Sequence, residues 1–134
     1  MRIYLDSAII IYAVEQVMPY ASIIETRLSA PDIVCVTSDL ARMECRVKPL
    51  QTKDIELLRD YDYYFEMAMA EIVVLSTQVI DCATDIRARY GFKTPDSIHL
   101  SAAIVSKCDV FLTNDYRLDR FNANSFFPDR AGSK

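Results

Sequence analysis

The segment RIYLDSA, residues 2–8, is a short apolar run that ends at an acid, Asp6. The segment VFLTND, residues 110–115, repeats this pattern near the other end of the chain, where the apolar run stops shortly before Asp115. Short, nearly continuous apolar runs of this kind are typical of strands that are buried on both faces of a parallel sheet. We therefore predict that two strands deliver carboxylates to one place.

Two more apolar runs, IVCVT and IVVL, complete a set of four predicted strands. The strands are expected at residues 2–6, 33–37, 72–75 and 109–112. Helical segments are expected between them, at residues 7–16, 19–30, 38–47, 53–70, 77–90 and 95–107. Connections this long require right-handed crossovers, which make neighbouring strands parallel. The predicted fold class is α/β, a three-layer α/β/α sandwich with a central, mainly parallel four- or five-stranded sheet, whose fifth strand would be a short edge strand at residues 125–127.

The length and composition are those of one folded domain. The chain has 134 residues, of which 51% are hydrophobic and 25% are charged, so it is long enough to bury one core. We expect a single domain over residues 1–128 and a disordered tail over residues 129–134. The longest apolar stretch, residues 8–14, is much shorter than the roughly 20 residues that span a bilayer, and the N-terminus does not resemble a signal peptide. A cytoplasmic location is therefore expected.

The charge and the cysteine content argue against two kinds of function, broad binding of nucleic acid and a zinc site. The net charge of −4 argues against broad electrostatic binding to nucleic acid, but it leaves room for a nuclease in which a divalent cation neutralises clustered acids. The four cysteines lie far apart without a C-x-x-C pair, and the only histidine is His99. Free thiols in a reducing compartment are expected in place of a zinc site.

Acidic residues from four distant parts of the sequence are predicted to meet at one edge of the sheet. Ligands of parallel α/β proteins bind beyond the carboxyl ends of the strands, where Asp6 and Asp115 are expected. Asp96 is expected in the first turn of a helix that starts at this edge, and Glu44 in a helix that leaves it. Each acid alone has an ordinary explanation, such as a helix cap or a surface ion pair. Their coincidence at one edge indicates a functional site.

A cluster of carboxylates needs compensating cations, because like charges raise one another's pKa. Oxygen ligands favour hard ions, so Mg²⁺ or Mn²⁺ is expected there. Such a cation keeps several waters, binds a phosphate oxygen and lowers the pKa of an attacking water. Metal-assisted phosphodiester hydrolysis is the chemistry that this set of residues predicts.

Four blocks of the sequence resemble the PIN-domain ribonucleases, in particular the VapC-type toxins of VapBC toxin–antitoxin systems. The blocks are RIYLDSA, SDLARMEC, TPDSIHLSAA and VFLTND, and the resemblance runs from Arg2 to about Phe121. It implies that four acids occupy the family's metal-binding and catalytic positions, namely Asp6, Glu44, Asp96 and Asp115. It also implies supporting polar positions around them, at Ser7, Thr113 and Asn114. His99 stands where the family often has a histidine and is expected in a structural or supporting role.

The resemblance implies an endoribonuclease that depends on Mg²⁺ or Mn²⁺. Such an enzyme uses a metal-activated water to hydrolyse RNA, for example tRNA or ribosomal RNA, and leaves 5′-phosphate and 3′-hydroxyl ends. The partners implied are a cognate antitoxin that blocks the active site and a second copy of the chain in a homodimer. Asp119 resembles an additional acid of some members, although an exposed ion pair with the flanking Arg117 or Arg120 is the simpler account.

A function from a different class stays open at this point, because the same fold could act as a non-catalytic RNA-binding or protein-interaction module. The segment LLRDYDYYFEMAMA carries more aromatic residues than one core-facing helix stripe needs, namely Tyr61, Tyr63, Tyr64 and Phe65. The surplus is either a partner surface or additional core. Cleavage of RNA in the presence of Mg²⁺ or Mn²⁺ separates the enzyme from the module.

Overall fold

A parallel β-sheet forms the centre of the structure, a computed structural model that describes residues 1–114. Within these residues the sheet has four strands in the order β3-β2-β1-β4, and every neighbouring pair is parallel. The strands are β1 (Arg2–Leu5), β2 (Val34–Ser38), β3 (Glu71–Val73) and β4 (Val110–Leu112). The helices are α1 (Ser7–Val14), α2 (Tyr20–Leu28), α3 (Asp39–Gln51), α4 (Ile55–Ala68), α5 (Thr77–Tyr90) and α6 (Thr94–Val105).

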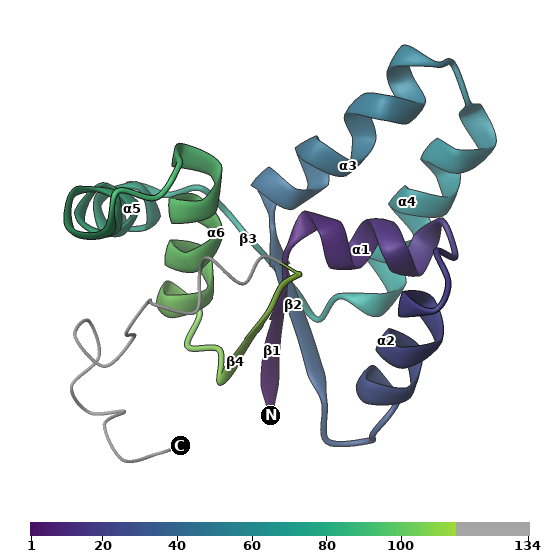
Figure 1. Cartoon of the computed structure of the whole chain (residues 1–134), viewed down its shortest axis with the longest axis horizontal. Coiled ribbons are helices and arrows are strands. Elements are labelled where there is room, and N and C mark those ends of the chain that lie inside the picture. The colour runs from purple at the N-terminus through teal and green to yellow at the C-terminus, as the bar shows by residue number, and fades with distance from the viewer. Residues whose placement is uncertain (115–134) are drawn as a thin grey trace.

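Helices cover both faces of the sheet (Figure 1), with α1 to α4 on one side and α5 and α6 on the other. Successive residues of a strand point to opposite faces, and β1 uses this alternation to fill both cores. Ile3 and Leu5 pack with residues of α1 to α4, whereas Tyr4 packs with Val36, Val73 and residues of α5 and α6. The predicted three-layer α/β/α sandwich with a parallel sheet is therefore confirmed.

All predicted strands and helices up to residue 114 are present, with small differences at their ends. The largest difference is at α3, which was expected to end at residue 47 and instead runs to Gln51. A proline lacks an N–H donor and disfavours a helical residue before it, so Pro49 favours an earlier end. The structure buries Pro49 in the last part of the helix instead. The predicted fifth strand and the predicted tail lie outside the described residues.

The aromatic segment that was predicted to be either a partner surface or core belongs to α4. Tyr61 and Phe65 are buried, Tyr64 is partly buried, and Tyr63 is 67% exposed. Core packing therefore accounts for most of the surplus, and Tyr63 remains on the surface. No helix within residues 1–114, α4 included, is long enough and apolar enough to cross a membrane.

The strand order creates a switch point between β1 and β4. From β1 the chain continues to β2 and then β3 on one side, and it returns to the other side of β1 to form β4. Ligand sites of parallel α/β proteins lie beyond the carboxyl ends of the strands at such a point. The N–H of Asp6 donates to the carbonyl of Leu112 (3.2 Å), so pairing continues past the end of β1. The two strand ends are therefore held side by side.

Candidate active site

Asp6 follows β1 and caps α1 at the switch point. Its carboxylate accepts a hydrogen bond from the backbone N–H of Ile9 (3.2 Å), which satisfies one of the free donors at the start of the helix. Burial raises the pKa of Asp6 above its ordinary value, and hydrogen bonds from the Thr113 side chain and the Ile9 backbone offset only part of this effect. The hydrogen bonds therefore stabilise the charge of the Asp6 carboxylate only in part. A bound cation would stabilise this charge further.

Glu44 lies in the second turn of α3, a helix that Ser38 caps by accepting from the N–H of Ala41 (3.3 Å). Its Oε1 accepts a 2.5 Å hydrogen bond from the Ser7 hydroxyl and lies 2.7 Å from Nε2 of His99. Burial by itself would raise the pKa of Glu44, but the hydrogen bonds from His99 and Ser7 lower it overall. Glu44 is thus held as a carboxylate in a fixed orientation.

His99 is buried, with 5% exposure, and uses both ring nitrogens. Nε2 faces Glu44, while Nδ1 lies 2.8 Å from the hydroxyl of Tyr4, which in turn donates to Ser38 Oγ (2.7 Å). A carboxylate only accepts hydrogen bonds, so the contact with Glu44 requires a hydrogen on Nε2. This chain of hydrogen bonds links β2, β1, α6 and α3, and it fixes the glutamate relative to the sheet.

Ser7 links the first two acids, because it follows Asp6 in the chain and donates to Glu44. Cys45, next to Glu44 in the sequence, is close to both carboxylates as well. Burial, followed by the charges of Glu44 and Asp6, raises the pKa of Cys45 to about 12. The structure therefore brings Asp6 and Glu44 to the same part of the molecule.

Asp96 lies in the first turn of α6, one turn before His99. Residues three positions apart share one face of a helix, so α6 presents Asp96 next to the turn that carries His99. The carboxylate is partly exposed and stands at the helix end whose dipole favours negative charge. This position leaves Asp96 available to a ligand at the edge where α6 begins.

The two residues after β4 have different contacts. Thr113 hydrogen-bonds Asp6 through its side chain, and it therefore supports that acid. The amide Nδ2 of Asn114 donates to the hydroxyl of Tyr12 (2.7 Å), which ties it to α1. Two acids considered from the sequence lie outside the described residues, Asp115 and Asp119.

The described carboxylates have the donor chemistry of a site for a hard cation. Asp6, Glu44 and Asp96 offer only oxygen atoms, as Mg²⁺ and Mn²⁺ prefer. In the described part of the chain no lysine or arginine forms an ion pair with them, and His99 is paired with Glu44 alone. The charges of Asp6 and Asp96 are therefore left for another cation. Within residues 1–114, no group of three or more His, Cys, Asp or Glu side chains is arranged to hold a metal ion by itself. The residues fit such an ion in type, with Asp115 as a further predicted ligand.

Sequence reasoning did not identify Tyr4 as part of this network. Tyr4 lies in an apolar strand and is fully buried, with 0% exposure. A buried tyrosine hydroxyl usually has a hydrogen-bond partner, so its position in a buried strand was a usable signal for a polar group nearby. The structure identifies the partners as Ser38 and His99.

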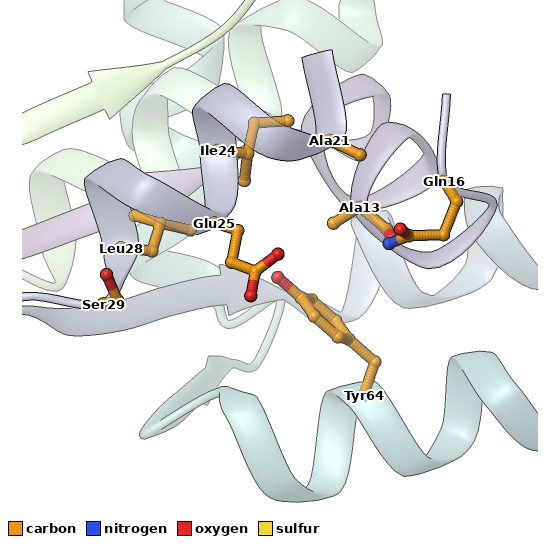
Figure 2. A pocket seen from close by; sticks show the side chains of 8 residues that line it. All are labelled: Ala13, Gln16, Ala21, Ile24, Glu25, Leu28, Ser29 and Tyr64. Carbon is orange, nitrogen blue, oxygen red and sulfur yellow. The ribbon is translucent and has the colours of Figure 1, made fainter. Parts of the chain in front are cut away.

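Two cavities flank α2. One of about 470 Å³ is lined by residues of α1, α2 and α4, and Figure 2 shows Tyr64 pointing across it toward the carboxylate of Glu25. None of the predicted site residues lines this cavity. The other, of about 400 Å³, lies between α1, α2 and the end of β4, and its wall includes Thr113 and Asn114. Because Thr113 also hydrogen-bonds Asp6, this second cavity borders the candidate active site.

Comparison with known proteins identifies the family. The sequence matches the PIN domain over residues 3–124, so the chain belongs to the PIN-domain family, as the four sequence blocks indicated. Membership of this family supports nuclease activity. A search of curated proteins found no match.

Two solved structures illustrate the similarity of the fold. A chain in the crystal structure of VapBC2 from Rickettsia felis bound to a DNA fragment from their promoter has a TM-score of 0.73 and 18% identity, with 92% of this chain and 95% of that chain covered. A chain of a toxin–antitoxin complex from Klebsiella pneumoniae has a TM-score of 0.69 and 17% identity, with 90% and 92% covered. At these identities the likeness establishes the fold alone.

Proposed function

We propose that the protein is an endoribonuclease that depends on Mg²⁺ or Mn²⁺ and acts as the toxin of a toxin–antitoxin pair. It hydrolyses RNA and leaves 5′-phosphate and 3′-hydroxyl ends. The observation that carries the proposal is the meeting of Asp6 and Glu44 at the switch point between β1 and β4. Membership in the PIN-domain family adds support for nuclease activity.

The residues of the site have separate parts in the proposed reaction. Four acids would hold the cation, namely Asp6, Glu44, Asp96 and Asp115. When bound, a divalent cation supplies positive charge for the phosphate oxygens and lowers the pKa of water. Ser7 and His99 keep Glu44 ionised and oriented, and Thr113 holds Asp6. Asp6 and Glu44 are thus held in place before the substrate arrives, which is the condition for electrostatic catalysis.

A protein antitoxin and a second copy of the chain are the proposed partners. Support for the antitoxin comes from the two similar structures, which are described as VapBC2 and as a toxin–antitoxin complex. Exposed apolar side chains on α3 support a macromolecular contact, since Met43, Val47 and Leu50 are 58%, 44% and 56% exposed. Their spacing puts them on one face of the helix. We assign this α3 stripe to one of the two partners.

A cleavage assay with purified protein tests the enzymatic proposal. Wild type should cleave RNA with Mn²⁺ or Mg²⁺ and stop when EDTA is added, and its products should be digested by an exonuclease that requires a 5′-phosphate. Asp96→Asn should lower the rate at least about 100-fold. The matched control Asp81→Asn, at an exposed position of α5, should cleave like wild type. Absence of cleavage by wild type with both metals, or equal rates for wild type and Asp96→Asn, would overturn the proposal.

Expression in a sensitive host without an antitoxin tests the toxin role. Wild type and Asp81→Asn should arrest growth, whereas Asp96→Asn should be tolerated. Growth arrest by wild type and Asp96→Asn alike, or by neither, contradicts a toxin that acts by cleavage. Co-expression of a small DNA-binding protein encoded next to this chain should restore growth if that protein is the antitoxin.

A non-catalytic RNA-binding or protein-interaction module is the second candidate. The observation that favours it is Tyr63, a large aromatic side chain of α4 that is 67% exposed. Such a module would bind its partner in the presence of either metal without cleaving RNA. Tyr63→Ala would then remove binding, while Asp6→Asn would leave it unchanged.

A further inference from the structure

The cavity between α1, α2 and the end of β4 shares a wall with the candidate active site. Its volume of about 400 Å³ lies in the range of small-ligand pockets, about 300–1,000 Å³. Thr113 belongs to both places, because its side chain hydrogen-bonds Asp6 and also lines the cavity. A group bound in this cavity therefore lies close to an acid of the site.

Two stacked tyrosines form the aromatic part of the cavity. The ring centroids of Tyr12 and Tyr20 are 4.7 Å apart, and the ring planes differ by 19°. The hydroxyl of Tyr12 accepts from Nδ2 of Asn114 (2.7 Å), which ties this ring to the end of β4. Tyr20 is 49% exposed, so part of the aromatic surface is open to solvent. The pair is a preformed platform on which another flat ring can stack.

Arg27 adds a positive charge to the same cavity. Tyr20, Ile23 and Arg27 follow the spacing of one helix face on α2. Arg27 is exposed, and within residues 1–114 it forms no ion pair. The cavity thus combines an open aromatic ring with a guanidinium that has no acidic partner in the described part of the chain.

We propose that this cavity binds one base and the adjoining phosphate of the RNA substrate, next to the bond that is cut. The inference rests on the proposed nuclease function and adds a binding subsite to it. Every nucleobase has a flat π face, so aromatic side chains bind single-stranded RNA by stacking with little dependence on sequence. A guanidinium beside the stack can bind a phosphate or cover the outer face of the base. Tyr20 and Arg27 are the substrate-binding residues.

Charge and position favour RNA over a protein segment as the occupant. The chain carries a net charge of −4, so a guanidinium that has no ion pair within residues 1–114 and lies beside two aromatic rings is a local exception that suits an anionic ligand. Through Thr113 the platform also adjoins Asp6, where the nucleotides flanking the cleaved phosphate have to lie. An apolar protein segment needs neither the charge nor this position.

The first experiment measures binding of a labelled single-stranded RNA of about ten nucleotides in EDTA, so that binding is read without cleavage. Tyr20→Ala and Arg27→Gln should each weaken binding by about tenfold at low salt. Two controls at exposed positions of α4, Met67→Ala and Arg59→Gln, should stay within about twofold of wild type. Thermal unfolding of each variant checks that it is folded.

Two further measurements separate stacking from a structural role of Tyr20. Tyr20→Trp should keep the affinity, and because the chain has no other tryptophan, its fluorescence should be quenched when a base stacks on it. An RNA of the same length with abasic sugars should bind wild type about tenfold more weakly than ordinary RNA does. The abasic comparison uses only the wild-type chain, so it decides the question even if a variant fails to fold.

The outcomes distinguish this inference from the proposed function. If wild type cleaves RNA with Mn²⁺ but neither Tyr20→Ala nor the abasic RNA changes the affinity, the inference is overturned and the nuclease stands. If binding depends on Tyr20 and on the bases but no cleavage occurs, the subsite is supported and the nuclease fails. If Tyr20→Ala leaves RNA affinity unchanged and abolishes neutralisation by a co-expressed antitoxin, the cavity belongs to that protein and the inference is overturned.

Discussion

Nε2 of His99 lies 2.7 Å from Oε1 of Glu44, and this contact joins the two helical layers of the molecule. The histidine belongs to α6 on one side of the sheet, and the glutamate belongs to α3 on the other side (Figure 1). Helices on opposite faces meet only beyond the ends of the strands, which is also where Asp6 stands. The pair therefore sets the orientation of a candidate metal ligand and links the two layers at the same point.

Removing the imidazole should lower both stability and activity. His99→Ala takes away one of the two side-chain partners of Glu44 and one of the two of the Tyr4 hydroxyl, and loss of a hydrogen bond to a charged group costs about 1.5–3 kcal/mol. We expect a lower urea midpoint and a fall of about tenfold or more in the rate of RNA cleavage, because the glutamate loses its orientation. His99→Gln keeps a donor and should recover part of both losses. Equal losses in the two variants would contradict the proposed hydrogen-bonding role.

The two acids of the site have pKa shifts of opposite sign, which predicts opposite effects of pH on stability. The pKa of Glu44 is lowered, so its contribution is present above the ordinary value of 4.5 and is lost as the pH falls through the lower value of the folded state. Burial raises the pKa of Asp6. Its contribution is therefore present below the ordinary value of 3.8 and is lost as the pH rises through the folded-state value.

Neutral variants of these acids should therefore shift stability in opposite directions at pH 7 in EDTA. Asp6→Asn removes an unfavourable buried charge, and asparagine caps a helix as well as aspartate does, so unfolding should require more urea than for wild type. Glu44→Gln removes a favourable charge and should unfold in less urea. The control Glu66→Gln, at an exposed position of α4, should match wild type. If both site variants shift the urea midpoint in the same direction, burial does not destabilise the charge of Asp6 while hydrogen bonds stabilise that of Glu44.

Some parts of this site were predictable from the sequence, and others depend on three-dimensional register. The position of Asp6 followed from an apolar run that ends in an acid, because strand ends of a parallel sheet share one edge. The link from Tyr4 to Ser38 was not predictable, since it depends on Tyr4 pairing with Val36 in the neighbouring strand. The direction of a polar side chain also cannot be predicted from its position after a strand, and the contact of Asn114 with Tyr12 was therefore not expected.

Binding of Mn²⁺ should stabilise the folded chain. A ligand that binds only the folded state at 100 times its dissociation constant adds about 2.7 kcal/mol, which a thermal unfolding scan in Mn²⁺ against EDTA can measure. Asp96→Asn should lose most of this gain, whereas Asp81→Asn should keep it. If Asp96→Asn is stabilised by Mn²⁺ as much as wild type, Asp96 does not bind the metal, whatever its effect on cleavage.

The hydroxyl of Tyr4 should matter although it lies one step behind the acids. Tyr4→Phe keeps the ring stacked on Phe111, where the centroids are 5.3 Å apart, but it leaves Nδ1 of His99 and Oγ of Ser38 without this partner. Leaving buried polar groups unsatisfied costs about 1–3 kcal/mol, whereas Tyr63→Phe on the surface should cost almost nothing. A double-mutant cycle of Tyr4→Phe with His99→Gln should give a coupling energy of about 0.5–3 kcal/mol. Additive effects in urea unfolding would mean that Tyr4 stabilises the core without restraining His99.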